Sequence, residues 1–307
     1  MAALPDPPSP TVDAIYAAYE ARRETGWREH LGASLIGHEC ERSLWLSFRW
    51  ATKAAHAGRI LRLFQTGQLE EARLVADLRA AGVQVLDKDP DTGRQWSVSA
   101  VRGHFGGSLD GKAIGVLEAP KTWHVFEAKT HSEKSFNELK KKGVEAAKPQ
   151  HAAQMQIYQH LTGLTRALYV ATNKNTDEIY IERVAYDPVA ATRLLVKAER
   201  VINADRPPAR ISDDPGYFVC RMCDHRATCH EGALPARNCR TCLSSTPIDG
   251  GAWHCARFDK TLIRSEQNAG CALHLYVPEL VHGEQVDAGD DFVTYRLATG
   301  EEWRDGP

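Results

Sequence analysis

Two short stretches, FGGSLDG at residues 105–111 and VFEAKT at residues 125–130, decide the fold expected for this chain. Glu127 and Lys129 stand two positions apart on a predicted strand, so they project from the same face. A hairpin between the two stretches can return Asp110 to the side of Glu127. Two carboxylates that converge repel each other unless a cation neutralises them. The spacing therefore predicts a site for a hard divalent cation, Mg²⁺ or Mn²⁺.

A lysine beside such a cation has a chemical use. Lys129 could orient or deprotonate a metal-activated water and offset the charge of a transition state at phosphorus. Taken alone, a Glu-x-Lys pair is more often a solvated surface pair. The apolar Val125 and Phe126 before the pair and the glycine-flanked Asp110 favour the site.

The segments around these stretches predict an α/β domain. Leu63, Leu69, Leu74 and Leu78 form a helical stripe within residues 60–82. Short strand-like runs separated by turn residues follow over 83–129. The remaining expected elements are a helical region at 132–162, strands in ALYVATNK and EIYIERVAY, and a helix at 187–204. This order predicts a mixed sheet covered by helices.

Composition sets the domain limits and the compartment. The Pro-rich residues 1–10 predict a disordered arm and not a secretory signal, and no stretch reaches the ~18 apolar residues of a membrane span. A cytoplasmic protein is expected, in which cysteines bind metals more often than they form disulfides. We predict a core domain at 11–232 and a metal-binding module at 233–280. Residues 281–307 are predicted to be an acidic tail, because 279–307 hold eight acidic and two basic residues.

Four motifs in order resemble those of the PD-(D/E)XK nuclease superfamily. GSLDG at 107–111 followed by FEAK at 126–129 resembles its signature, although Gly-Ser-Leu stands where the proline of the motif falls. Gly67-x-x-x-Glu71 resembles the first acidic motif of the exonuclease branch, and Gln154-x-x-x-Tyr158 resembles its Q-x-x-x-Y motif. The resemblance implies a restriction-endonuclease-like core, a mixed central sheet flanked by helices, with a small C-terminal metal-stapled module.

The resemblance also implies roles for single residues. Asp110 and Glu127 would hold the divalent ion together with the carbonyl of Ala128. Glu71 would contact the metal directly or through water, and the adjacent Glu70 could exchange roles with it. The implied catalytic residues are Glu71, Asp110, Glu127, Lys129, Gln154 and Tyr158.

The helix after the sheet carries the remaining substrate features. Gln154 and Tyr158 would position the substrate strand, whereas by themselves they would indicate ordinary i, i+4 packing. Residues 129–148 hold six lysines and three acids, and Lys140–Lys142 could contact phosphates or form a solvated helix face. The aromatic residues near Cys40 could stack on bases but are more often core.

The cysteines divide into two sets. Cys40, followed after the core by Cys220-x2-Cys223-x5-Cys229, resembles the cluster segments of the iron–sulfur nucleases, which include CRISPR-associated exonucleases and nuclease domains of recombination helicases. The resemblance implies a [4Fe–4S] cluster, while the same four thiolates would suit zinc equally well on physical grounds.

The second set predicts a structural zinc site in a zinc-ribbon-like module. It consists of Cys239-x2-Cys242, Cys255 and Cys271, with His254 and His274 as spare ligands. This module, or the acidic tail, could bind a protein partner.

Together these features predict a metal-dependent DNA exonuclease acting on single strands or free ends, with 5′→3′ polarity as in the iron–sulfur relatives. One alternative is a structure-selective endonuclease or a DNA-end-processing subunit of a larger complex. A second alternative, from another class, is a DNA-binding adaptor that does not cut. The complete Asp110, Glu127 and Lys129 set argues against the adaptor.

Overall fold

A five-stranded mixed sheet forms the centre of the computed structural model, which describes residues 9–23 and 26–307. The strand order is β2-β5-β6-β7-β8; β6 and β7 are parallel, and all other neighbours are antiparallel. Both central strands are largely buried; β7 has the continuous apolar run expected of such a strand, whereas β6 also buries the polar residues His124, Glu127 and His131. The strands are β2 (Gln84–Leu86), β5 (Gly111–Ile114), β6 (His124–His131), β7 (Arg166–Asn173) and β8 (Ile179–Ala185).

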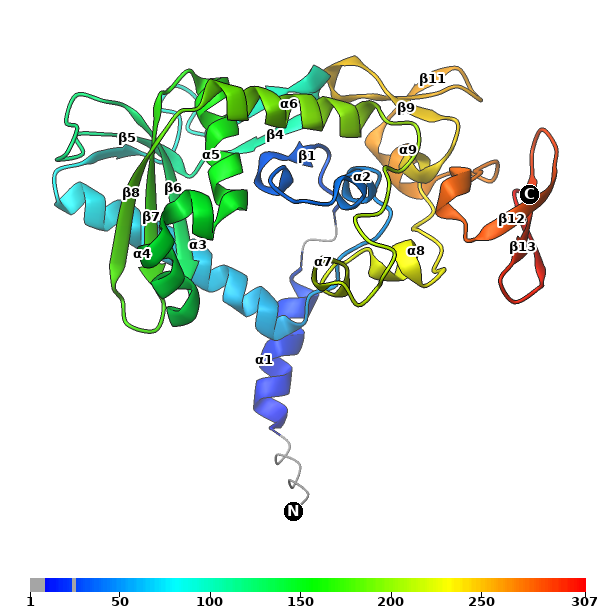
Figure 1. The fold of residues 1–307 in the computed structure, drawn as a ribbon, viewed down its shortest axis with the longest axis horizontal. Coiled ribbons are helices and arrows are strands. Elements are labelled where there is room, and N and C mark those ends of the chain that lie inside the picture. Colours follow the sequence, from blue (N-terminus) through cyan, green and yellow to red (C-terminus); the bar gives the residue numbers. More distant parts are fainter. Residues whose placement is uncertain (1–8, 24–25) are drawn as a thin grey trace.

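Helices cover both faces of this sheet (Figure 1). One long helix, α3, packs Leu74 and Val75 into an apolar cluster with Phe126 of β6. Two helices that connect β6 to β7 cover the other face, and Pro149 separates them because its ring cannot continue the helix before it. The three helices are α3 (Gly58–Ala80), α4 (Glu133–Ala147) and α5 (Pro149–Thr162). A mixed sheet flanked by helices agrees with the expected core.

The leucine stripe lies on a helix, α3, as expected, but only part of it is buried. Leu74 is 1% exposed, whereas Leu63 and Leu69 are 39% and 67% exposed. The helix extends past the sheet, where it packs against α1 (Pro10–Ala21).

A second, smaller sheet is formed by three strands from the first half of the chain. Its order is β1-β4-β3, with β1 and β4 parallel. Trp45, Phe48 and Trp50 are buried, which confirms that these aromatic residues belong to the core. The elements here are β1 (Leu31–Gly32), α2 (Glu41–Phe48), β3 (Ser97–Ala100), β4 (Phe105–Ser108) and α6 (Pro188–Asn203), the last of which packs against α5 and α2.

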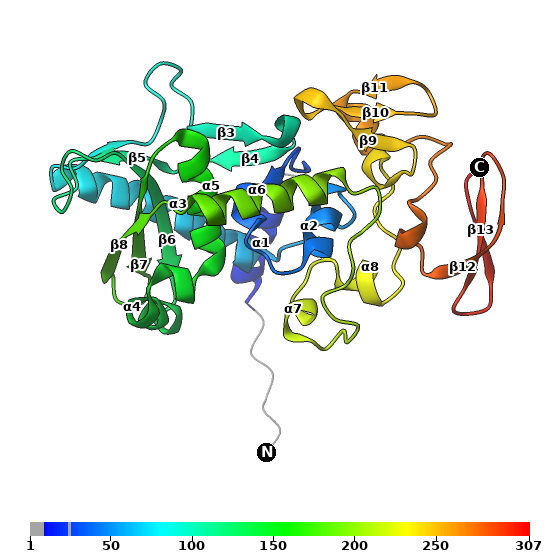
Figure 2. The same cartoon turned by 45° about the horizontal axis from the view of Figure 1, so that its top comes forward.

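The cysteine-rich region forms small elements beside this second sheet (Figure 2). Its three-stranded antiparallel sheet has the order β11-β10-β9. Arg240 joins the region to the core: its guanidinium lies 3.6 Å from the ring centre of Trp50 and donates to the carbonyl of Glu29 at 2.8 Å. The elements are α7 (Phe218–Arg221), α8 (Arg226–His230), β9 (Ser245–Pro247), β10 (Trp253–Cys255), β11 (Lys260–Leu262) and α9 (Arg264–Ala269).

The segment expected as an acidic tail folds into a fourth sheet of the described residues, at the C-terminal end of the molecule (Figure 1). Tyr295 is 1% exposed and forms a small core with Tyr276, Val281 and Val293. The backbone N–H of Tyr276 donates to Oδ2 of Asp305 at 2.6 Å, so one of the acidic residues has a structural contact. The strands are β12 (Gly283–Ala288), β13 (Val293–Leu297) and β14 (Glu302–Asp305).

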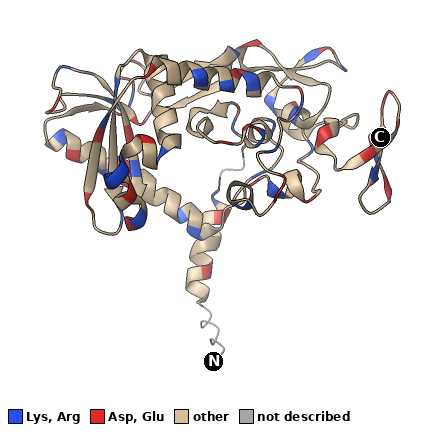
Figure 3. Ribbon diagram, viewed as in Figure 1, with Lys and Arg blue, Asp and Glu red and all other residues tan. Residues whose placement is uncertain are grey.

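Short 3-10 turns complete the chain at η1 (Ala33–Leu35), η2 (Val101–Gly103), η3 (Cys239–Thr241), η4 (Asp249–Gly251) and η5 (Pro278–Leu280). The arm expected over 1–10 lies almost entirely outside the described residues, and α1 begins at Pro10. None of the helices in the described ranges combines the length and apolar character that crossing a membrane requires. Acidic and basic residues are interspersed along the ribbon (Figure 3), and the net charge of the chain is −2.

Candidate active site

Asp110 lies where the chain passes from the small sheet to the central sheet. It sits between β4 and β5, and its Oδ2 accepts the backbone N–H of Ala128 at 2.9 Å. Pairing of Gly111 with Phe126 brings this end of β5 against β6. The hairpin predicted from the sequence therefore places Asp110 next to the Glu127–Lys129 segment.

Glu127 and Lys129 project from one face of β6, as expected. The Glu127 side chain is fully buried, and its Oε1 forms an ion pair with Nζ of Lys129. Nζ also donates to the carbonyl of Ala128 at 3.2 Å and lies 4.0 Å from Oδ2 of Asp110. Oε2 of Glu127 is buried and has no hydrogen-bond partner among the described residues. Lys129 thus lies close to the carboxylates of both Glu127 and Asp110, and Oε2 of Glu127 is left without a donor among the described residues.

Glu71 completes the acidic cluster from α3. Its pKa is raised to about 7, first by burial and then by the charge of Asp110. Glu70 instead pairs with Arg73 at 3.4 Å, so the structure places Glu71, and not its neighbour, beside Asp110. Gly67, one turn earlier, lies close to β6, and an added Cβ there would make only an ordinary contact with Oγ1 of Thr130 at 3.9 Å.

The charges of this cluster are strongly coupled. Burial raises the pKa of Glu127 to about 7; Lys129 opposes this shift and Asp110 adds to it. Burial also disfavours a charged Lys129, but Glu127 and Asp110 outweigh that effect and raise its pKa. Without a cation, therefore, Glu71 and Glu127 keep their protons to higher pH than ordinary carboxyl groups do.

Gln154 and Tyr158 lie beneath the site. They are 7% and 1% exposed, and Nε2 of Gln154 donates to the Tyr158 hydroxyl at 3.3 Å. That hydroxyl donates to the carbonyl of Ser108 at 2.8 Å, two residues before Asp110. Burial raises the pKa of Tyr158 to about 12, so it stays a donor. The pair supports the Asp110 segment from below, which differs from the expected contact with a substrate strand.

An open cleft of about 580 Å³ exposes one side of the cluster. Glu71, Asp110, Ala128 and Lys129 line it, together with Leu63, Phe64, Gly67 and Gln68 of α3. Thr130 lies beside Gly67 of α3, and the opposite wall consists of His131, Ser135, Lys148, His151 and Lys174.

Sequence reasoning missed the two histidines and Lys174 of this wall, and included Lys148 only as the end of the lysine-rich segment 129–148. Lys140 and Lys142 point elsewhere and pair with Glu178 and Glu138. A signal for His151 was present, because it precedes Gln154 by three residues and so shares a side of the helix with it. Lys174 carried no such signal.

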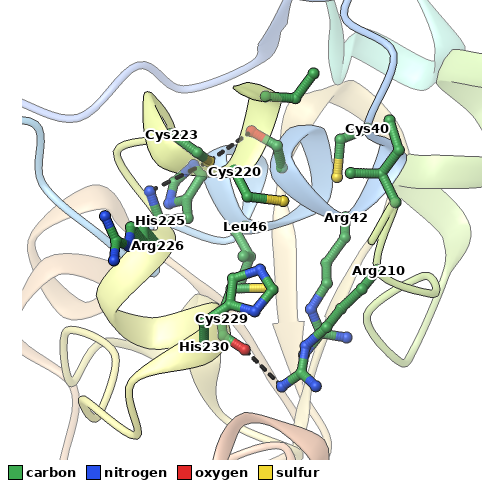
Figure 4. Close-up of a pocket in the computed structure, with 13 residues that line it drawn as sticks. Cys40, Arg42, Leu46, Arg210, Cys220, Cys223, His225, Arg226, Cys229 and His230 are labelled. Atoms are coloured by element: carbon green, nitrogen blue, oxygen red, sulfur yellow. Dashed lines mark hydrogen bonds between the residues drawn. The ribbon is translucent and has the colours of Figure 1, made fainter. Parts of the chain in front are cut away.

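The first cysteine set surrounds one hollow (Figure 4). Cys40 precedes α2, and the other three thiols come from the α7–α8 segment. Burial raises the pKa of Cys220, and the thiols of Cys40, Cys229 and Cys223 add to the effect. Cys223 Sγ accepts the backbone N–H of His225 at 3.4 Å and lies 3.6 Å from Oγ of Ser43.

The second set gathers around the small β9–β11 sheet. Burial raises the pKa of Cys239 to about 12, and Cys242, Cys271 and Cys255 add to it. Neither histidine named as a spare ligand is free: His254 lies 3.2 Å from Asp259, and His274 contacts Oγ1 of Thr241 at 3.2 Å. All eight cysteines are free thiols.

Within residues 9–23 and 26–307, no group of three or more His, Cys, Asp or Glu side chains is arranged to hold a metal ion. Within each cysteine set and within the carboxylate set, the side chains lie near one another, but their sulfur or oxygen atoms do not converge on one point at metal-bonding distance. The metal-stapled character expected for the C-terminal module is not demonstrated by this geometry.

The fold and the site define a mixed α/β protein with an acidic cluster and a lysine in an open cleft. Its sequence matches no family model and no curated protein. Among solved structures, SSO0001 is similar at 14% identity and a TM-score of 0.43, over 72% of this chain and 96% of that one. The alkaline exonuclease LHK-Exo from Laribacter hongkongensis is similar at 16% identity and a TM-score of 0.40, over 61% of this chain and 89% of the other.

LHK-Exo in complex with dAMP matches with the same coverage and TM-score at 14% identity. At these identities and TM-scores, similarity assigns no function. The function proposed below therefore depends on the residues of the site.

Proposed function

We propose that this chain is a metal-dependent deoxyribonuclease that hydrolyses phosphodiester bonds at DNA ends. The observation that carries the proposal is the cluster of Glu71, Asp110 and Glu127 around Lys129, beside an open cleft. A cluster of this kind concentrates negative charge at considerable electrostatic cost. A cation bound together with a phosphodiester would relieve that cost.

The donor set suits a hard divalent cation by its chemistry. Carboxylate and carbonyl oxygens are the ligands that Mg²⁺ and Mn²⁺ prefer, and Glu71, Asp110, Glu127 and the carbonyl of Ala128 would hold the ion. The partnerless Oε2 of Glu127 is one acceptor available for it. When bound, the ion would supply Lewis acidity and a counter-charge at the scissile phosphate.

Lys129 contributes the second part of the chemistry. Its ammonium is anchored by Glu127 and the Ala128 carbonyl, and it lines the cleft. From there it can orient the attacking water and offset the negative charge of the pentacovalent transition state. The reaction is a hydrolysis in which water displaces the 3′ oxygen without a covalent enzyme intermediate.

We further propose that the substrate is single-stranded or has frayed ends. Phe64 is 49% exposed on the α3 wall of the cleft, where an unpaired base could stack on it. The 5′→3′ polarity is proposed from the resemblance to the iron–sulfur nucleases alone.

The first cysteine set is proposed to hold a [4Fe–4S] cluster, with zinc as the alternative. Four thiols around one hollow are the correct donors in the correct number. The thiolates of such a cluster bind different irons, so they need not converge on one point as the ligands of a single ion do. Donors at Cys223 Sγ from His225 and Ser43 suit a thiolate ligand. A cluster of this type fits a reducing, cytoplasmic compartment.

The second set is proposed to hold structural zinc. Cys239, Cys242, Cys255 and Cys271 influence one another electrostatically, and the small sheet beside them has few apolar residues of its own. Thiols with raised pKa values lose their protons when they bind a metal, so binding would release protons and stabilise this region. We also propose that a protein partner binds at this module or at the β12–β14 sheet.

End-labelled oligonucleotides test the nuclease. With Mg²⁺ or Mn²⁺, the wild-type protein should shorten single strands progressively, and Lys129→Ala should leave them intact. Lys140→Ala is the matched control, because Lys140 lies outside the cleft and pairs with Glu178.

Circular single-stranded DNA separates the alternatives. An exonuclease leaves the circle intact, whereas cutting of the circle indicates an endonuclease. Binding of DNA without cutting of any of these substrates would establish the adaptor and overturn the nuclease.

A further inference from the structure

The wall of the cleft opposite α3 contains two histidines that share one tyrosine. His131 ends β6 and His151 lies in the first turn of α5. The Tyr169 hydroxyl, from β7, lies 2.8 Å from Nε2 of His131 and 2.9 Å from Nδ1 of His151. On the far side, Nδ1 of His131 lies 3.1 Å from Oγ of Ser135. These four side chains form a continuous row of hydrogen bonds, called here the histidine–tyrosine row.

The row can run in only two directions. A phenol has one proton, so Tyr169 donates to one imidazole and must accept from the other. If Tyr169 donates to His151, the Nε2 of His151 carries the remaining proton of that ring. If Tyr169 donates to His131, the Nε2 of His151 is a lone-pair acceptor. The tautomer of His151 is therefore coupled through Tyr169 to the tautomer of His131.

Nε2 of His151 is the open end of the row. It has no hydrogen-bond partner among the described residues, it is not among their buried unpaired atoms, and the residue lines the cleft. Whatever occupies the cleft supplies its partner. An anionic oxygen bound there favours the direction in which Tyr169 donates to His151 and Nε2 of His151 carries a proton. In the other direction a lone pair of Nε2 would face a lone pair of the oxygen and repel it.

The surroundings of the row are cationic. Burial, together with the charges of Lys129, His131 and Lys148, lowers the pKa of His151 to about 3. Burial likewise lowers the pKa of His131 to about 4, with added effects of Lys148, Lys129 and Lys174. Lys148 and Lys174 form no ion pair with the described residues. The cleft is thus acidic on one side and cationic on the other, which suits a metal ion on one side and a phosphate on the other.

We propose that His151 is a phosphate-binding residue of this cleft: its Nε2–H donates to a non-bridging phosphate oxygen of the substrate strand, in the tautomer held by Tyr169 and His131. Lys148 and Lys174 supply the surrounding positive charge. The inference rests on the proposed function for the nature of the substrate. It assigns substrate contact to His151, whereas Gln154 and Tyr158 support the Asp110 segment from beneath.

Two substitutions of similar size isolate the donor. In His151→Gln the amide nitrogen can replace Nε2–H, whereas in His151→Met no donor remains. Binding of a short fluorescein-labelled single-stranded oligonucleotide is measured by anisotropy, with Ca²⁺ in place of Mg²⁺ to prevent cutting. We expect His151→Met to weaken binding about ten-fold or more, and His151→Gln to keep most of it. Tyr169→Phe should give an intermediate loss, because the tautomer is no longer held.

Cleavage kinetics with Mg²⁺ provide the second measurement. His151→Met should raise KM for the oligonucleotide more than it lowers kcat, and Lys140→Ala should change neither. Thermal unfolding verifies that both His151 variants are folded. If the folded methionine variant binds and cuts as the glutamine variant does, the donor is dispensable and the inference is wrong.

The same experiments separate this inference from the proposed nuclease. A wild-type protein that cuts no DNA, but loses oligonucleotide binding in His151→Met, overturns the nuclease and keeps the phosphate-binding residue. A wild-type protein that cuts DNA, together with a folded His151→Met variant that binds and cuts as well as the wild type, supports the nuclease and overturns the phosphate-binding role of His151.

Discussion

The hydroxyl of Tyr158 donates to the carbonyl of Ser108 at 2.8 Å and thereby ties α5 to the segment that ends in Asp110. The tyrosine is 1% exposed, so water cannot replace the bond if it is lost. A residue that the motif alone would assign to the substrate strand therefore has a structural contact two residues from Asp110, a carboxylate of the proposed site. This contact gives the first prediction.

Tyr158→Phe should destabilise the fold and slow cleavage. Loss of the hydroxyl leaves the Ser108 carbonyl unpaired in the core, which costs roughly 1–3 kcal/mol. Displacement of Asp110 should lower kcat more than it raises KM. Denaturant unfolding and cleavage kinetics measure the two effects. Tyr186→Phe is the control, because the Tyr186 hydroxyl contacts His160 in an exposed position. Equal stability of both variants would contradict the structural role.

Two glycines near the site should respond oppositely to alanine. At Gly107 a Cβ would lie 2.6 Å from the Tyr158 hydroxyl, so Gly107→Ala should force apart the contact beneath Asp110 and reduce both stability and activity. At Gly67 the nearest atom would lie 3.9 Å away, and alanine is the better helix former by about 1 kcal/mol. Gly67→Ala should therefore be at least as stable as the wild type. Thermal unfolding of both variants measures the difference, and a tolerated Gly107→Ala would contradict the packing described.

The metal-free protein should lose stability as pH rises toward 7. The pKa of Glu127 is 4.5 when it is unperturbed and about 7 in the fold, and the pKa of Glu71 is raised likewise. Between these values the unfolded chain has released the proton while the folded chain still holds it, so the folded state is progressively disfavoured. Below pH 4.5 the effect is absent, and above about 7 it is complete.

Unfolding in EDTA across this range, with Glu127→Gln alongside, measures the effect. The buried histidines, whose pKa values are lowered, act in the opposite direction in both proteins and cancel in the comparison. The gap between wild type and variant should widen in favour of the variant as pH rises. Mg²⁺ or Mn²⁺ should stabilise the wild type more above pH 7 than below it, because binding displaces protons. A constant gap would contradict the raised pKa of Glu127.

The two cysteine sets should bind metal independently. An anaerobic preparation should be brown, and Cys223→Ser should remove the colour while zinc remains bound. Cys271→Ser should do the opposite, because Cys271 lies with the β9–β11 sheet. Visible absorption and metal analysis distinguish the cases. A colourless anaerobic protein that holds only zinc would overturn the iron–sulfur proposal.

Local pattern in the sequence determined the framework. Alternation in VFEAKT placed Glu127 and Lys129 on one face, and the glycine-flanked Asp110 before it indicated a hairpin, because these features depend on residues close in the chain. The order of helices and strands from residue 58 to residue 203 followed from the same kind of pattern. The sequence also favoured core positions for Trp45, Phe48 and Trp50 around α2, where the structure buries them.

The tertiary structure alone decided which side chains meet. Nothing local separates Glu70 from Glu71 or turns Tyr158 inward toward Ser108, and the acidic segment after residue 280 gave no sign of its three strands. His131, His151 and Tyr169 come from three elements and meet only because α5 packs across the parallel pair β6 and β7. Contacts of this kind depend on packing between distant segments, and periodicity within a segment carries no information about them.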